Sequence, residues 1–180
     1  MRLKSMIVKT LIASILSSLI TLTARLVLDM LASNSSDTAR NTAMIFLSLL
    51  APVSFSVILI YLLHVYRGNG EGEVWEDYPE TYGGIIRDIP IVVKKEYPAL
   101  ALIASVGALN LTLWLLNHLL IHSRPIKIIT DIFISVSSWG IIFRDDILQK
   151  TLGYLSGTLF TCAVYVIVYA LFRWKWRKFM

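Results

Sequence analysis

The sequence predicts an all-α membrane protein with four transmembrane helices and one further amphipathic helix, interfacial or re-entrant, over residues 126–143. Of its 180 residues, 56% are hydrophobic and 16% are charged, and the mean hydropathy is +0.68. Because soluble domains carry about 25% charged residues, this composition excludes a large soluble domain. Residues 98–121 and 151–172 contain no Lys, Arg, Asp or Glu, and each stretch is long enough to cross a bilayer. We therefore expect a single polytopic membrane domain over residues 1–180.

The first two spans are predicted over residues 6–28 and 42–66. The first follows a short basic N-terminus, and a cleaved signal peptide is the alternative interpretation of such a stretch. A retained helix is favoured, because the bulky Leu22 does not fit a small-x-small cleavage site. In the second span a kink is expected at Pro52, since proline removes one backbone donor from the helix.

The segment 67–96 is predicted to be a polar cytoplasmic loop between the second and third spans. Its first half contains several glycines followed by a run of acidic residues with aromatic residues between them. No Gly-Lys-Ser/Thr follows the glycines and the acidic residues lack calcium-loop spacing, so neither a phosphate loop nor a calcium site is predicted. Residues 85–96 are expected to form a short amphipathic lead-in to the third span.

The third span is predicted over residues 98–121 and the last over residues 151–172. Gly153 and Gly157 form a G-x-x-x-G pattern at the start of the last span, which is typical of close helix packing. Contact within the same chain is favoured, because several other helices are available. A basic and aromatic interface anchor follows this span and consists of Arg173, Trp174, Lys175, Trp176, Arg177 and Lys178.

Residues 126–143 are apolar overall but carry polar residues at helical spacing. Lys127, Asp131, Ser135 and Ser138 fall on one face, which is the pattern of an amphipathic helix in the membrane interface. A fifth span and a re-entrant element lining a cavity are the two alternatives. The fifth span is disfavoured, because an aspartate at the bilayer midplane costs about 2.5–3.5 kcal/mol on insertion scales.

The distribution of basic residues predicts four spans with both termini in the cytoplasm of a cell. With four spans, three Lys/Arg near the N-terminus, four in the loop and four at the C-terminus share one side, against five on the other. The positive-inside rule assigns the richer side to the cytoplasm. A fifth span would move the basic C-terminus to the opposite side and weaken this asymmetry.

Polar residues near the end of the third span form a candidate ion or proton path. The residues of this path are His118, His122, Arg124, Asp131, Arg144, Asp145 and Asp146. On a continuous helix, His118 and His122 would point the same way, but the glutamate of a His-Glu-x-x-His motif is missing. The alternatives are interfacial histidines and, for the Arg-Asp-Asp triplet, a polar turn before the last helix.

No catalytic residue, metal site or cofactor is predicted, and the sequence favours a protein that is not an enzyme. The single cysteine, Cys162, excludes a disulfide within the chain and a Cys-based zinc site. No G-x-S-x-G pattern surrounds a serine nucleophile candidate.

Three functions are compatible with these features. The favoured one is an accessory or regulatory subunit that packs against a membrane partner. The alternative is an oligomeric channel or small transporter with a polar path near residues 118–131, and a lipid-modifying enzyme is the weakest. The expected partners are the lipid bilayer and a membrane protein or a second copy of the chain. No nucleic-acid partner is expected, because the net charge of +5 is concentrated in an interface anchor.

Overall fold

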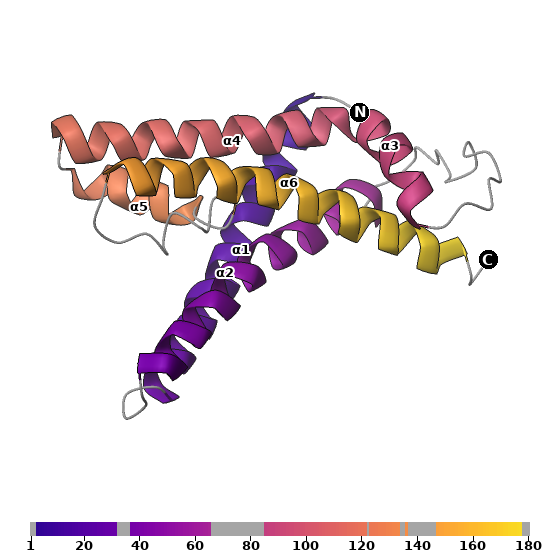
Figure 1. Cartoon of the computed structure of the whole chain (residues 1–180). Coiled ribbons are helices and arrows are strands. Elements are labelled where there is room, and N and C mark those ends of the chain that lie inside the picture. Colours follow the sequence, from indigo (N-terminus) through magenta and orange to yellow (C-terminus); the bar gives the residue numbers. More distant parts are fainter. Residues whose placement is uncertain are drawn as a thin grey trace.

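The computed structural model describes residues 3–31, 37–65, 85–121, 123–133, 136 and 147–177. Its helices are α1 Leu3–Leu31, α2 Asp37–Ile60, α3 Ile85–Lys95, α4 Tyr97–Leu116, α5 Arg124–Ile132 and α6 Ile147–Arg177 (Figure 1). Two π-helical turns, η1 Tyr61–Val65 and η3 Asn117–Ile121, extend α2 and α4 directly. The predicted all-α membrane fold is confirmed.

Within the described residues, four stretches are long and apolar enough to cross a membrane. They are Leu3–Leu28, Ile45–His64, Tyr97–Leu120 and Ile147–Phe172. The shortest has 20 residues, and at about 1.5 Å per residue it covers the hydrocarbon core of a bilayer. The chain is a multi-pass membrane protein.

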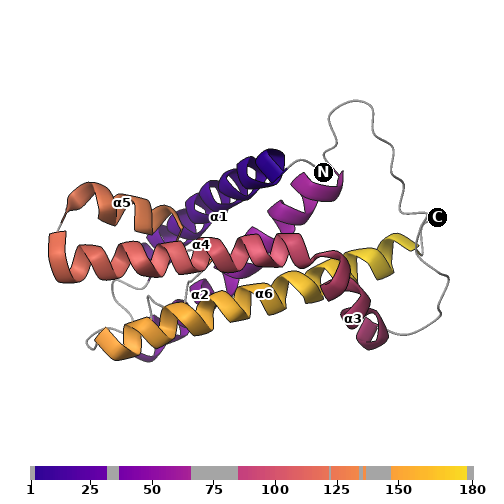
Figure 2. The same cartoon turned by 90° about the horizontal axis from the view of Figure 1, so that it is seen from above.

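The spanning helices form two antiparallel pairs that cross at a steep angle (Figure 1). Helix α1 packs on α2 and α4 packs on α6, while the contact between α2 and α6 joins the two pairs. The start of α1, the end of α6 and α3 lie at one end of the α4–α6 pair, which we call the α3 end (Figure 2). Helix α5 and the start of α6 lie at the opposite end, the α5 end.

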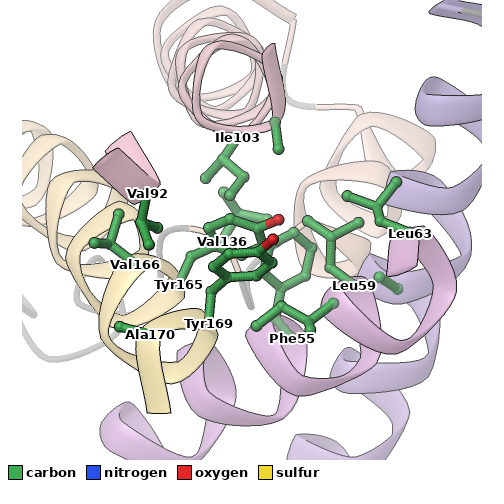
Figure 3. Packing of buried hydrophobic residues seen from close by; sticks show 13 residues of the cluster. Phe55, Leu59, Leu63, Val92, Ile103, Val136, Tyr165, Val166, Tyr169 and Ala170 are labelled. Atoms are coloured by element: carbon green, nitrogen blue, oxygen red, sulfur yellow. The ribbon is translucent and has the colours of Figure 1, made fainter. Parts of the chain in front are cut away.

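The core forms where α2, α4 and α6 meet. Phe55 and Leu59 of α2 and Ile103 of α4 are fully buried around Tyr165 and Tyr169 of α6 (Figure 3). In lipid, such contacts stabilise a bundle mainly through close packing, because the exposed alternative is equally apolar. This cluster therefore fixes how the two helix pairs meet.

Helix α4 packs tightly against α6 at Gly107. This residue is buried, and a Cβ atom placed on it would overlap the side chain of Thr158 on α6. Small residues at such positions let two helix backbones come together in a membrane. Gly107 is thus a close-packing position, although it is not part of a G-x-x-x-G pattern in the sequence.

Helix α5 turns back into the bundle from the α5 end. It begins at Arg124 and ends at Ile132, so it differs from the predicted helix over residues 126–143. Nine residues cover only about 14 Å, which is too short to span. The chain then reaches Val136, which is fully buried in the core and whose carbonyl accepts a hydrogen bond of 2.9 Å from Thr161 Oγ1.

The position of Val136 fits the re-entrant alternative for this segment. Thr161 lies near the middle of the spanning stretch Ile147–Phe172, so the chain at Val136 has entered about half of the bundle depth. Helix α6 starts at the α5 end (Figure 2), so the chain returns to the end from which it came. Residues 134–135 and 137–146, which include Arg144, Asp145 and Asp146, lie outside the described part of the structure.

The far half of the α1–α2 hairpin extends away from the α4–α6 pair (Figure 1). We call residues 22–30 of α1 and 42–46 of α2 the distal arm, and none of its described side chains is buried. A shallow apolar groove of about 580 Å³ runs along it. The groove is lined by Leu19, Ile20, Thr23, Ala24, Val27, Leu28 and Phe46.

Candidate functional site

A buried carboxyl group marks the junction of α3 and α4. Glu96 occupies a bend between the two helices, where its amide donates to Val92 O at 2.8 Å and its carbonyl accepts from Leu100 N at 2.9 Å. Pro98, in the first turn of α4, has no backbone N–H, which interrupts the hydrogen-bond ladder and explains the bend. Only 5% of Glu96 is exposed.

The Glu96 side chain points to other helices instead of capping its own. It makes no cap hydrogen bond to α4. The hydroxyl of Tyr165 donates to Oε2 of Glu96 at 2.8 Å, and His64 Nε2 lies 3.2 Å from the same oxygen. The hydroxyl of Tyr169 also donates to this carboxyl group. We call these four residues the Glu96 cluster.

Two local features bring the other members of the cluster to Glu96. The π-helical turn Tyr61–Val65 widens the end of α2 and carries His64, whose ring packs on Tyr169 at a centroid distance of 4.9 Å. Tyr165 and Tyr169 are four residues apart on α6, so both rings lie on the same face, with their hydroxyl oxygens toward the same side (Figure 3). The cluster therefore connects α2, the α3–α4 bend and α6.

The Glu96 cluster stabilises a negative charge. Burial is the largest single influence on the pKa of Glu96 and by itself raises it. Hydrogen bonding and charge attraction to His64, with the hydroxyl groups of Tyr165 and Tyr169, together outweigh burial and hold the pKa of Glu96 below its ordinary value of 4.5. The folded protein thus favours the carboxylate form over the carboxylic acid.

This lowered pKa makes stability depend on pH in the acidic range. Ionised Glu96 contributes its full stabilisation above pH 4.5, and this contribution is lost as the pH falls through the lower pKa of the folded state. We expect the stability difference between the wild type and Glu96→Gln to shrink as the pH is lowered from 7 to 3. Thermal unfolding in nanodiscs at several pH values measures this difference, and a constant difference would contradict the assignment.

The structure describes the side chains of only two residues of the sequence-predicted path. His118 is exposed on the π-helical turn η3, where its ring stacks on Trp114 at 5.4 Å, and Arg124 is exposed at the start of α5. Asp131 lies in α5, but its side chain is outside the described set, as is all of His122. The expectation that His118 and His122 point the same way assumes a continuous α-helix, but the structure has the π-helical turn η3 over Asn117–Ile121.

The predicted packing and anchor residues lie on α6. Gly153 and Gly157 are both buried there. The helix continues through Arg177, so five of the six anchor residues are helical, although their side chains are not described and Lys178 lies beyond the described chain.

The Glu96 cluster suits hydrogen bonding and helix coupling. Within the described ranges, no three His, Cys, Asp or Glu side chains lie close enough to hold a metal ion. Glu96 and His64 alone supply two ligands, fewer than the three that catalytic zinc sites use. The serine and threonine hydroxyls of the spans mostly bond carbonyls of their own helix, as Thr21 does with Ser17 O at 2.8 Å.

Sequence reasoning missed the Glu96 cluster because its members stand alone in the chain. His64 follows an apolar span, and Glu96 follows Lys94 and Lys95 in a segment that reads as an interfacial lead-in. The available signal was the pair Tyr165 and Tyr169 inside an otherwise apolar span, since buried tyrosine hydroxyls require hydrogen-bond partners.

The fold and this site define a small four-span membrane protein with a buried polar cluster at one end of the bundle. No protein-family model, curated protein sequence or solved structure matches the chain.

Proposed function

We propose that this protein is an accessory or regulatory subunit that packs against a membrane partner. One observation carries the proposal: the Glu96 side chain fastens α3 to the bundle through His64 and Tyr165. Helix α3 lies outside the spans, so a partner that moves it would act on the ends of α2, α4 and α6 together. A cluster that connects several helices in this way suits a regulatory subunit better than a pore. Its polar side chains hydrogen-bond one another, whereas the polar side chains of a pore face a shared cavity.

We place the binding surface for the partner on the distal arm, inside the membrane. None of its described side chains is buried, and its apolar groove lies within two of the spanning stretches. A transmembrane helix of the partner is the proposed occupant, since small residues such as Ala24 let another helix approach closely.

The test begins with native purification of the tagged chain in lipid nanodiscs, followed by mass determination. We expect a stoichiometric partner protein in the complex. Leu19→Trp fills the groove and should reduce the recovered partner at least tenfold, whereas Leu109→Trp should leave it unchanged. The two leucines are comparably exposed, at 54% and 50%, but Leu109 lies on α4, away from the groove. A lone monomer, or equal recovery in both variants, would contradict the proposal.

A channel or small transporter is the second candidate, and the position of Val136 favours it. Val136 lies in a 3₁₀-type turn, its amide donating to Phe133 O at 3.1 Å, and backbone at membrane depth that is not α-helical recurs in channels and transporters. In reconstituted vesicles, a channel would lose flux when Asp131→Asn and His118→Ala are combined. Unchanged flux would eliminate this path. A closed homo-oligomer in the nanodisc measurement would favour the channel or transporter function.

A further inference from the structure

We propose that the α3 end binds the headgroup of an anionic phospholipid through Lys94 and Lys95. Helix α3 lies across α6 with Val92 fully buried against it. Both lysines are exposed at the last turn of α3, directly before the third spanning stretch begins at Tyr97. The two charges therefore lie where a membrane helix meets the headgroups.

The neighbouring side chains favour a lipid over a soluble anion. Ile91 and Val93 are 38% and 39% exposed beside the two lysines. At a bilayer surface, an apolar side chain can contact acyl chains while an adjacent ammonium group contacts lipid phosphates. A nucleic acid would satisfy the lysines alone and leave the apolar side chains in water.

Exposed tyrosines place the two lysines at the same bilayer level. Tyr97 is 68% exposed at the start of α4, and Tyr61 is 52% exposed at the end of α2. Tyrosine is enriched at the membrane–water interface, with its ring among the headgroups. Tyr61 and Tyr97 thus indicate where two spans meet the membrane interface at the α3 end. Lys94 and Lys95 lie directly before Tyr97 in the sequence.

The buried position of Glu96 keeps its carboxyl group away from the surface that carries the lysines. Its carboxyl group follows Lys95 directly, but it is held inside the bundle by His64 and Tyr165. Helix α6 also ends at this end of the molecule (Figure 2), and its last five residues in the sequence include three basic ones. Clusters of basic residues beside a membrane helix attract anionic lipids, and each contributes to binding near the surface.

The test is native mass spectrometry of the full chain in detergent, titrated with phosphatidylglycerol or phosphatidylcholine. We expect phosphatidylglycerol to bind more tightly, and about fivefold weaker binding for each lysine neutralised, or about thirtyfold for Lys94→Gln/Lys95→Gln. Lys94→Arg/Lys95→Arg should retain binding. Lys127→Gln is the matched control, because Lys127 is exposed on α5 at the opposite end.

Each result of this titration decides the proposal. Selective loss in the double glutamine variant, with the control and the arginine variant unchanged, supports it. Equal affinity for both lipids, or equal loss in Lys127→Gln, would overturn it. Inorganic phosphate at the same concentration should not displace the lipid, and displacement would assign the site to a free anion instead. Equal thermal midpoints of the variants exclude unfolding as the cause.

Discussion

Replacing Glu96 with alanine is expected to lower the free energy of unfolding by about 2–4 kcal/mol. Truncating Glu96 removes a shared acceptor from Tyr165 and His64, and each buried polar group left unpaired costs about 1–3 kcal/mol. The loss leaves the hydroxyl of Tyr165 without its acceptor on Glu96. Equilibrium unfolding in mixed micelles measures this change.

Variants of the tyrosines separate the hydrogen bond from general destabilisation. Tyr165→Phe removes a donor to an ionised carboxylate, a bond that contributes about 1.5–3 kcal/mol. Tyr97→Phe is the control, since Tyr97 is 68% exposed while Tyr165 is fully buried. Combining Glu96→Gln with Tyr165→Phe should cost less than the sum of the two single changes. Strict additivity would show that the two groups do not act together.

Gly107→Ala is expected to destabilise the bundle by about 1–3 kcal/mol, because a methyl group at this position overlaps the side chain of Thr158. Alanine is the better helix former by about 1 kcal/mol, so intrinsic propensity alone predicts the opposite sign. The sign of the change in unfolding free energy therefore reports directly on how closely α4 and α6 pack.

A second substitution on α6 tests the same contact. Thr158→Ala removes the two atoms that a methyl group on Gly107 would meet first, so the double variant should recover part of the lost stability. Ala108→Leu provides a control on the exposed side of α4 and should change stability little. If Gly107→Ala stabilises the protein, or if Thr158→Ala brings no recovery, the close contact between α4 and α6 is wrong.

The membrane fold could be predicted from sequence because long apolar stretches have few alternatives in a bilayer. A charge-free stretch such as residues 98–121 must satisfy its backbone internally, and a helix does so without help from the rest of the chain. The same reasoning located α3, whose apolar and basic residues alternate at helical spacing. Both predictions depend on local pattern alone.

The path of the segment after the third span was harder to predict from the sequence, because it depends on contacts between residues that are distant in the chain. Lys127 and Asp131 gave a clear amphipathic pattern, but the pattern does not determine whether such a helix lies flat or turns inward. The inward turn follows from the hydrogen bond between Thr161 and Val136, which lie 25 residues apart. No periodicity within residues 126–143 encodes that bond.

The candidate site was missed for a similar physical reason. His64, Glu96 and Tyr165 lie on three different elements, and the bond between Glu96 and Tyr165 joins residues 69 apart in the chain. The sequence instead directed attention to His118, whose short spacing to His122 is visible locally. Close spacing is easy to recognise, whereas tertiary pairing of isolated polar residues requires the packing of the helices.

Hydrogen–deuterium exchange of α3 most directly tests whether the Glu96 cluster fastens this helix to the bundle. In nanodiscs, amides of Ile85–Lys95 should exchange at least tenfold faster in Glu96→Ala than in the wild type, because the alanine removes the acceptor that joins the end of α3 to Tyr165 of α6. Amides in the middle of α6 should exchange at unchanged rates. Equal exchange of α3 in both proteins would contradict the account, since the helix would then be held by its apolar contacts alone.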